Sequence, residues 1–260
     1  MNIVVCIKQV PDTTEIKIDP VTNTLIREGV ESIINPFDLY AIEEAVRLKE
    51  TYGGTVTAIS MGPPQAEAAL REAVSLGVDN IILLSDRKFA GADTWATSLT
   101  LSAAIKKLGN VDLIFFGQQA IDGDTAQVGP GVAAHLDIEQ VCFISKIVEI
   151  NDKKVVLERL MEDGYDVLTT EMPLAISVVK EINTPRLPSL RGKKNARAVE
   201  LTVWKADDLE LDELSIGLNG SPTQVVKIFS PQLQKDGEKY EVSADEAVEI
   251  LYRRLKEIGR

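Results

Sequence analysis

The chain has 260 residues, with 28 Lys and Arg against 40 Asp and Glu, so its formal net charge is −12. A protein that neutralises phosphate groups needs a basic face, so this balance argues against nucleic acid and against an anionic membrane surface as partners. Aromatic residues make up only 5% of the chain, which argues against a surface on which bases stack. The length suits one large α/β domain, or such a domain with an extension.

The start of the chain is apolar from Ile3 to Ile7 and predicts a strand rather than a signal peptide. No apolar run approaches the roughly 20 residues of a membrane span. Cys6 and Cys142 both lie in apolar, strand-like runs, which favours buried free thiols over a disulfide. We therefore expect a cytoplasmic protein that is not inserted in a membrane.

Short apolar runs alternate with amphipathic helical patterns over the first two-thirds of the chain. We expect a helix over 38–49, with Asp38 as its N-cap after Pro36 and with its end at Gly53. A second helix is expected to begin at Pro63-Pro64, and a third is expected to be capped by Asp93 or Thr94. Alternation of this kind indicates an open, mostly parallel sheet with helices on both faces. The expected elements in chain order are a strand over 3–7, a hairpin over 15–27, strands over 55–60, 80–84 and 111–116, and a helix over 125–136.

The pattern changes after residue 140. Closely spaced strands are expected over 141–150, 154–159, 165–170 and 175–180, and we interpret them as an antiparallel addition to the sheet. Residues 183–197 read as a basic, exposed loop, and 200–220 as an extended linker. A final helix is expected after Ser243, with an apolar stripe that packs on its own domain or on a partner. We expect three parts: an α/β domain over 1–182, a docking loop over 183–198 and an extension over 199–260.

Ligands of open α/β sheets bind beyond the carboxyl ends of the strands, so the turns that follow strands are the candidate site. The longest such turn, 117–129, has small residues and is predicted to end at a helix N-terminus, which attracts phosphate. We interpret Asp122 and Asp124 in this turn as helix caps. A metal site is the less favoured alternative, because two carboxylates without a third ligand argue against a bound metal ion.

Motifs of several other functions are absent from the sequence. It contains no G-x-G-x-x-G, no P-loop pattern, no G-x-S-x-G and no C-x-x-C. The single histidine, His135, lies in an apolar stretch and is interpreted as structural rather than catalytic. The residues alone therefore predict a nucleotide-binding α/β module without covalent catalytic machinery.

Five ordered segments resemble the β subunit of electron-transfer flavoproteins along the whole chain. They are VCIKQVPD (Val5–Asp12), INPFDLYAIEEAVRLKE (Ile34–Glu50), SMGPPQAEAALREAVSLGVD (Ser60–Asp79), FFGQQAIDGDTAQVGP (Phe115–Pro130) and LERLMEDGYDVLTTEMPLAISV (Leu157–Val178). The resemblance implies an adenine-nucleotide α-hydrolase-like fold and a heterodimer with an α subunit that carries FAD. It also implies that the C-terminal extension helps to hold the flavin domain of the α subunit.

The resemblance implies an adenine nucleotide along the strand ends, in the turns already selected by the strand-end rule. The implied cofactor-binding residues are Cys6, Asn35, Pro36, Phe37, Asp38, Met61, Gln118, Gln119, Ala120, Ile121, Asp122, Gly123, Asp124, Thr125, Ala126, Gln127, Val128 and Gly129.

Two kinds of nucleotide occur in this position in the family. Ordinary carriers hold a structural AMP and resemble QAIDDDCNQTGQ or QAIDNDCNATGQ in the turn, whereas electron-bifurcating members hold a second FAD that accepts hydride from NADH. This chain has QAIDGDTAQVGP, so Gly123 and Ala126 replace larger side chains and leave room for a larger ligand. We therefore expect FAD, with AMP as the alternative.

The family also docks acyl-CoA dehydrogenases through a loop of the β subunit. Its counterpart here is 185–192, with Arg186, Leu187, Leu190 and Arg191 as the candidate docking residues and Leu190 as the apolar anchor. The alternative is a solvated basic loop that carries an incidental leucine.

The function implied is a bifurcating electron carrier. NADH would reduce the β-subunit FAD, ferredoxin or flavodoxin would receive one electron, and an acyl-CoA dehydrogenase would receive the other through the α-subunit FAD. Whether the protein counts as an enzyme is left open, because NADH oxidation would occur only in the complex. The rivals are an ordinary carrier with structural AMP, a nucleotide-sensing module without redox function, and a metal-dependent hydrolase that uses Asp122 and Asp124.

Overall fold

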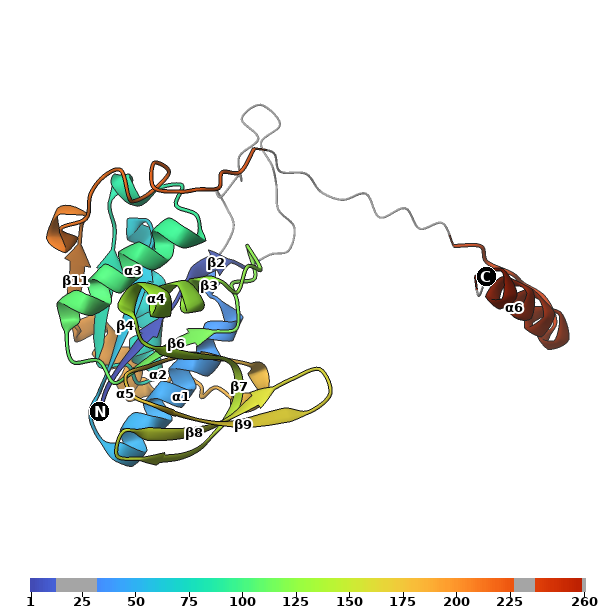
Figure 1. Ribbon diagram of the computed structural model, residues 1–260, viewed down its shortest axis with the longest axis horizontal. Helices are drawn as coiled ribbons and strands as arrows, with labels where there is room; N and C mark the ends of the chain where they lie inside the picture. Colours follow the sequence, from blue (N-terminus) through green and yellow to red (C-terminus); the bar gives the residue numbers. More distant parts are fainter. Residues whose placement is uncertain (13–31, 227–236, 259–260) are drawn as a thin grey trace. The chain divides into compact units, whose positions relative to one another are not determined.

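The computed structural model describes residues 1–12, 32–226 and 237–258. Contacts between residues divide the chain into two compact units, Met1–Val226 and Lys227–Arg260. The second unit contains one helix, α6 (Ala244–Ile258), among its described residues. The first unit contains the remaining elements and the candidate site (Figure 1).

The first unit is built on a nine-stranded sheet with the order β11-β5-β4-β1-β6-β10-β7-β8-β9. Neighbouring strands from β11 to β7 are parallel, and β7, β8 and β9 are antiparallel to one another in turn. A separate antiparallel pair joins β2 (Gln9–Pro11) to β3 (Ser32–Ile34). The strands of the large sheet are β1 (Asn2–Cys6), β4 (Thr55–Met61), β5 (Asn80–Leu84), β6 (Leu113–Gly117), β7 (Glu139–Asn151), β8 (Lys154–Leu160), β9 (Tyr165–Glu171), β10 (Leu174–Val178) and β11 (Leu201–Trp204).

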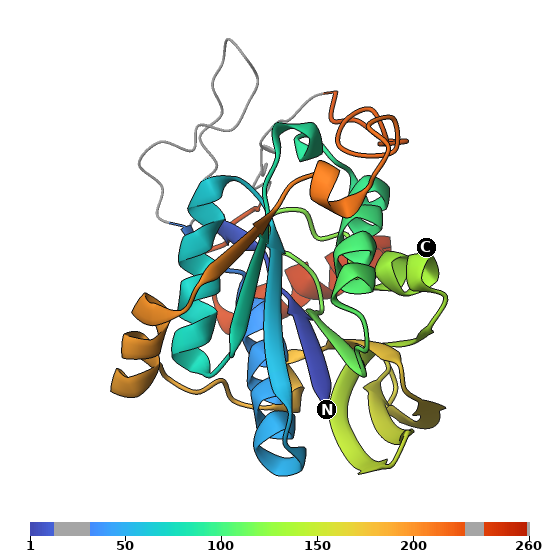
Figure 2. The same ribbon diagram turned by 90° about the vertical axis from the view of Figure 1, so that its left-hand side faces the viewer.

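Helices cover both faces of the parallel strands, as Figure 2 shows with the sheet between the two helical layers. One face packs against α1 (Pro36–Tyr52) and α2 (Glu67–Leu76), and the other against α3 (Thr94–Leu108) and α4 (Val128–Leu136). A fifth helix, α5 (Leu190–Ala198), packs on α2. Short 3-10 turns are η1 (Pro64–Ala66), η2 (Arg87–Phe89), η3 (Lys180–Ile182) and η4 (Asp207–Leu209).

The apolar runs form central strands because their side chains are buried on both faces. In β1, Ile3 and Val5 enter the core under α1 and α2, whereas Val4 and Cys6 enter the core under α3 and α4. Burying a large apolar side chain of this kind stabilises the fold by about 1.5–3 kcal/mol. The predicted fold class, a mostly parallel open α/β sheet, is confirmed.

Several helix ends follow the predicted signals and two do not. Asp93 caps α3 by accepting from Ala96 N, and α1 ends at Gly53 with φ 74, both as predicted. Asp38 is not the N-cap of α1, because the helix begins two residues earlier at Pro36, whose fixed φ suits the first helical position. The predicted start of α4 at Thr125 is also wrong. Asp124 and Ala126 have φ of 49 and 53, a left-handed backbone that delays the helix to Val128.

The strands after residue 140 confirm the antiparallel addition for β7, β8 and β9. The last of the expected strands, β10, instead lies parallel between β6 and β7. All of its residues from Leu174 to Val178 are buried, which is typical of a strand inside a parallel sheet rather than in a half-exposed antiparallel one.

Two segments predicted to lack regular structure are part of the first unit. The second half of the expected loop forms α5, capped by Ser189, whose hydroxyl accepts from Gly192 N at 2.9 Å. The expected linker contains β11, which extends the sheet beside β5, and it buries Ala206 and Ile216. The linker interpretation is therefore wrong, and the compact unit continues to Val226.

The remaining expectations concern the ends of the described chain. The predicted hairpin over 15–27 lies outside the described residues. The last helix begins at Ala244, directly after Ser243 as predicted, and the main-chain N–H of Ser243 donates to Glu246 Oε2 at 3.2 Å, which is one half of a capping box. Among the helices that the structure describes, none is long and apolar enough to cross a bilayer.

Gly192 provides a test of how tightly α5 packs on α2. A Cβ at this position would come within 2.1 Å of the carbonyl oxygen of Ser75. We predict that Gly192→Ala lowers the free energy of unfolding by about 1–3 kcal/mol, although alanine is the better helix former. Urea denaturation measures the change. Gly123→Ala is the control, since a Cβ there meets nothing within 4 Å. Equal stability of Gly192→Ala and the wild type would contradict the packing described.

Candidate functional site

The carboxyl ends of the central strands β4, β1 and β6 meet at one edge of the sheet. Cys6, the last residue of β1, pairs with Ile59 on one side and with Phe116 on the other. This register brings together Cys6, Met61 and the turn that follows Gly117, as the strand-end rule predicts. The predicted cofactor-binding segments therefore converge on one edge of the sheet.

The longest of these segments, Gln118 to Gln127, connects β6 to α4 and is mostly exposed. The N–H groups of Gly123 and Asp124 donate to Ala120 O at 3.2 and 2.8 Å, and Gln119 Nε2 donates to Asp124 Oδ1 at 2.9 Å. These bonds shape the turn from within. Gln127 occupies the N-cap position of α4 without a side-chain cap bond, so N–H groups of the first helical turn are available to an anion.

Asn35 ties this turn to the start of α1. Its Nδ2 donates to Gln119 O at 2.9 Å, and its Oδ1 accepts from Ile121 N at 3.1 Å. The same Nδ2 donates to Asp38 Oδ1 at 2.9 Å, while Asp38 Oδ2 accepts from Lys8 N at 2.7 Å. Side chains of Asn35 and Asp38 thus connect the ends of β1 and β6 through hydrogen bonds.

Gly117 allows this approach. A Cβ at Gly117 would lie 2.4 Å from Asp38 Oδ1 and 2.6 Å from the carbonyl carbon of Phe37. Any other residue would force α1 away from the end of β6. The first glycine of the turn is therefore required by packing rather than by an unusual backbone conformation.

Burial dominates the electrostatics beneath the turn. It raises the pKa of Asp38 from 3.8 to about 7, against the opposing effect of hydrogen bonds from Asn35, Lys8 N–H and Gly117 N–H. Burial also raises the pKa of the Cys6 thiol, and the charge of Asp38 adds to that effect. Cys6 is therefore a neutral thiol in the core rather than a nucleophile.

Two contacts at the rim of the site involve residues that were not among the predicted ones. Lys8 Nζ lies 2.6 Å from Asp122 Oδ1, with both side chains partly exposed. Thr94 Oγ1, at the start of α3, donates to Gln127 Oε1 at 2.9 Å. Lys8 lies in the turn directly after the first strand, which the strand-end rule selects, but it was not among the candidate cofactor-binding residues. The interaction of Thr94 with Gln127 has no signal in the sequence.

The predicted cofactor residues divide into a buried and an exposed group. Cys6, Asn35 and Asp38 are buried, and Pro36, Phe37 and Met61 are half-buried. The exposed or half-exposed group, which a ligand can reach, consists of Gln118, Gln119, Ala120, Ile121, Asp122, Gly123, Asp124, Thr125, Ala126, Gln127, Val128 and Gly129.

Asp122, Asp124 and His135 each contact a neighbouring side chain. Within residues 1–12, 32–226 and 237–258, no three His, Cys, Asp or Glu side chains cluster in a way that would hold a metal ion. Asp122 and Asp124 are each engaged by a neighbouring side chain. His135 packs edge-on against Trp95, with ring centroids 4.8 Å apart.

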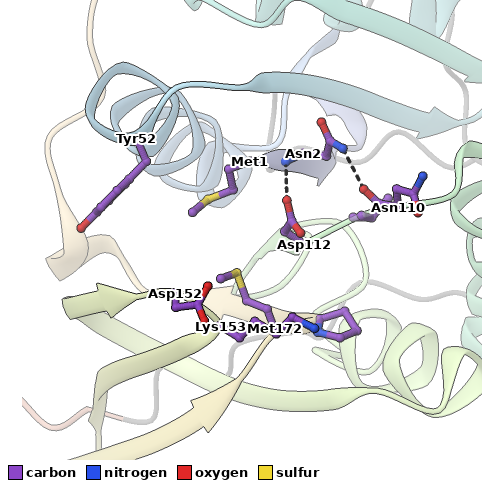
Figure 3. A pocket seen from close by; sticks show the side chains of 10 residues that line it. Met1, Asn2, Tyr52, Asn110, Asp112, Asp152, Lys153 and Met172 are labelled. Carbon is purple, nitrogen blue, oxygen red and sulfur yellow. Dashed lines mark hydrogen bonds between the residues drawn. The ribbon is translucent and has the colours of Figure 1, made fainter.

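A cavity of about 500 Å³ lies at the opposite, amino-terminal edge of the sheet (Figure 3). Three of its lining residues bond to one another: Asn2 N donates to Asp112 Oδ2 at 2.7 Å, and Asn2 Nδ2 donates to Asn110 O at 2.9 Å. The strand-end rule places ligands at the carboxyl edge, so this cavity is not the candidate site.

The predicted docking residues lie where η3 leads into α5. Leu187 and Leu190 are 88% and 89% exposed, and Arg191 is also exposed. Arg186 instead binds α1, with Nε 2.8 Å from Glu43 Oε2 and Nη1 2.6 Å from Glu50 Oε1. Arg186 therefore fixes the segment that presents the two leucines.

Helix α5 is held at its far end as well. Arg71 Nη1 of α2 donates to the carbonyl oxygens of Ala196 and Val199 at 2.6 and 3.3 Å. The candidate docking segment is thus anchored on both sides, and Leu187 and Leu190 project from a fixed base.

An open α/β sheet whose central strands end beneath a long exposed turn has the architecture of nucleotide-binding α/β proteins. The family model of the electron transfer flavoprotein domain matches residues 22–209. The chain belongs to the electron transfer flavoprotein family, as a β subunit, and this confirms the resemblance seen in the sequence. A β subunit of this family forms a heterodimer with an α subunit.

Three relatives are similar over nearly the whole chain. The electron transfer flavoprotein subunit beta of Thermoanaerobacterium thermosaccharolyticum is 54% identical, with 98% of each chain covered. The subunit of the same name from Clostridium acetobutylicum is 51% identical, with 99% of this chain and 98% of the relative covered. The caffeyl-CoA reductase-Etf complex subunit CarD of Acetobacterium woodii is 49% identical over the same shares.

The buried carboxyl group of Asp38 predicts a pH-dependent stability. Since its folded pKa, about 7, exceeds its ordinary value of 3.8, the folded state binds the proton more tightly than the unfolded state. Its contribution to stability is therefore full below the ordinary value and is lost as the pH rises through the folded pKa.

We predict that Asp38→Asn flattens the fall in the free energy of unfolding between about pH 4 and about pH 7, because the amide does not titrate. Urea denaturation at several pH values measures the slope. Asp163→Asn, an exposed aspartate in the turn after β8, serves as the control and should keep the wild-type slope. An unchanged slope in Asp38→Asn would show that Asp38 does not titrate in this range.

Proposed function

We propose that the carboxyl edge of the sheet binds FAD, and that the chain works as the β subunit of an electron-bifurcating electron transfer flavoprotein. The observation that supports this proposal is the exposed turn from Gln118 to Gln127, which leads into a helix with uncapped N–H groups. Such groups bind a diphosphate well, because they are donors and carry the positive end of the helix dipole.

The residues present fit a cofactor larger than AMP. A Cβ at Gly123 would meet nothing within 4 Å, so open space adjoins the turn. Residue 126 has φ 53, a conformation that asparagine tolerates well, yet the chain has the smaller Ala126 there. Small side chains at both positions leave the volume that a dinucleotide needs.

When bound, FAD would supply the capacity to accept a hydride from NADH and to pass electrons on singly. The chain's own residues would bind and orient it: main-chain N–H groups of the turn and of α4 would hold the phosphates. Lys8 would supply a cation beside Asp122, 2.6 Å away at the rim.

The electron acceptors we propose are ferredoxin or flavodoxin and, through the α-subunit FAD, an acyl-CoA dehydrogenase. Support for the second comes from the exposed Leu187 and Leu190 and from a relative that is named as a subunit of a caffeyl-CoA reductase complex. We further propose that the apolar stripe of α6 packs on the α subunit and that the complex is cytoplasmic, where Cys6 and Cys142 stay as the free thiols seen here. The stripe consists of Ala244, Ala247, Val248, Leu251, Leu255 and Ile258.

The nucleotide content of the purified heterodimer tests the proposal. Denaturing the complex and separating the released nucleotides should give FAD at about two per heterodimer and no AMP. The spectrum of the intact complex should also bleach on addition of NADH. One FAD with one AMP per heterodimer would overturn the FAD assignment and would support an ordinary carrier.

Gly123→Asn tests the volume argument. We predict that the larger side chain, in the open space beside the turn, weakens FAD binding by about tenfold, as measured by titration of the cofactor-free complex. Gly109→Asn is the control: its backbone has φ 64, which asparagine tolerates, and a Cβ there also meets nothing within 4 Å. Equal FAD affinity in Gly123→Asn and the wild type would show that this space is not used.

Leu190→Ala tests the docking segment. An exposed leucine on a rigid base is suited to fill a partner's pocket, so we predict about a tenfold slower electron transfer to the acyl-CoA dehydrogenase with unchanged flavin content. Leu214→Ala, at a leucine that is 75% exposed elsewhere on the first unit, is the control. Transfer at the wild-type rate in Leu190→Ala would exclude this contact.

A further inference from the structure

Asn35 and Asp38 were expected to contact the cofactor, but both lie beneath the turn rather than at its surface. Asn35 is 1% exposed and Asp38 is 6% exposed. Their polar atoms are already used: Asp38 accepts from Lys8 N and Asn35 Nδ2, and Asn35 bonds to Gln119 O and Ile121 N. A ligand on the exposed side of the turn therefore meets main-chain groups that these side chains hold in place.

The two side chains specify one arrangement of the turn. Both carboxyl oxygens of Asp38 act as acceptors here, Oδ2 for Lys8 N and Oδ1 for Asn35 Nδ2, so the nitrogen of the Asn35 amide faces Asp38. That orientation presents Nδ2 to the carbonyl oxygen of Gln119 and leaves Oδ1 to accept from the N–H of Ile121. In the reversed orientation, Asn35 Oδ1 would face two oxygens and Nδ2 would face an N–H group. Every contact would be mismatched.

We propose that Asn35 and Asp38 are positioning residues that set the affinity of the site for its cofactor without touching it. Asn35 holds Gln119 and Ile121, and Asp38 fixes the amide of Asn35. This inference rests on the proposed function, because it concerns the same cofactor site, and it adds the residues that preorganise the site.

Among the described residues, the other contacts of the turn do not replace this buried tie. Thr94 Oγ1 donates to Gln127 Oε1 at 2.9 Å, which connects the last residue of the turn to α3 but does not hold Gln119 or Ile121. Lys8 and Asp122 form an ion pair in which both side chains are partly exposed, and such pairs contribute little. The bond from Gln119 Nε2 to Asp124 Oδ1 lies within the turn and does not connect it to the sheet. Removing the Asn35 amide would leave Gln119 O and Ile121 N without their partner, which frees this part of the turn to move.

The test uses the full α–β complex and FAD as the probe. In Asn35→Ala we expect FAD affinity to fall by about tenfold or more. In the cofactor-free complex we expect faster hydrogen exchange at the amide of Ile121. Exchange is a readout of positioning that does not depend on cofactor binding.

Asn183→Ala is the matched control. Asn183 Nδ2 also donates two hydrogen bonds, to Tyr40 O and to Glu44 Oε2, each at 3.0 Å, but neither partner lies in the turn. We expect this variant to lose thermal stability while keeping FAD affinity within about twofold of the wild type. A loss of affinity equal to that of Asn35→Ala would mean that both variants act through general stability, and the proposal would fail.

Asp38→Asn keeps the proposal testable if Asn35→Ala does not fold. Its amide can still accept from Lys8 N but then turns an NH₂ group toward that of Asn35, so Asn35 loses its orientation. We expect Asp38→Asn to bind FAD more weakly. The measurement is made at about pH 8, where the stability gained by removing the buried charge offsets the stability lost with the hydrogen bonds.

Undiminished affinity in both variants would overturn the inference. A wild-type complex that holds no FAD beyond the one in the α subunit would instead refute the proposed function, and exchange at Ile121 would still report on the tie.

Discussion

The hydrogen bonds of a buried asparagine hold the functional edge of this protein together. Asn35 connects to Gln119, 84 residues later in the chain, and through Asp38 it connects to the end of β1. Burying a carboxyl and an amide costs solvation free energy, and here each polar atom is compensated by a partner of matching type. The raised pKa of Asp38 is the remaining sign of that cost. The turn itself is mostly exposed. Bonds among its own residues shape it from within, and the bonds of Asn35 connect it to the rest of the sheet edge.

The two candidate interaction sites are built in the same way. At the carboxyl edge, buried Asn35 and Asp38 position an exposed turn. Near α5, Arg186 binds Glu43 and Glu50 of α1 and thereby fixes a segment whose leucines are almost fully exposed. At the first site the side chains that hold the backbone are buried, and at the second the side chain is ion-paired. The groups that face outward are small residues at the first site and leucines at the second. Such preorganisation lowers the entropy that a partner or cofactor has to lose on binding.

Local patterns in the sequence were sufficient to predict the elements that form the core. Strands β1, β4 and β5 and the cap at Asp93 were predicted nearly as observed, because apolar runs and capping residues act over a few residues. Strand β11 was missed because an edge strand with partly exposed residues, from Leu201 to Trp204, carries no clear alternation. The start of α4 was misplaced because a left-handed Ala126 has no compositional signal.

The sequence predicted which segments form the candidate site, but not what each residue does there. The strand-end rule and the family resemblance both selected the turns after β1, β4 and β6, and the register of the sheet brings them together. Neither approach showed that Asn35 and Asp38 are buried, since their partners are distant in the chain and meet only in the folded sheet. The pairings of Lys8 with Asp122 and of Thr94 with Gln127 were hidden for the same reason.

The central claim is that the turn from Gln118 to Gln127 and the start of α4 receive the phosphates of an adenine-containing cofactor. An experimental structure of the α–β complex purified with its own cofactor tests it most directly. The account predicts phosphate oxygens within hydrogen-bonding distance of main-chain N–H groups in this segment, with Asn35 still bonded to Gln119 and Ile121 beneath it. Phosphates bound at another edge of the sheet, or a turn closed by its own side chains in the loaded complex, would contradict it.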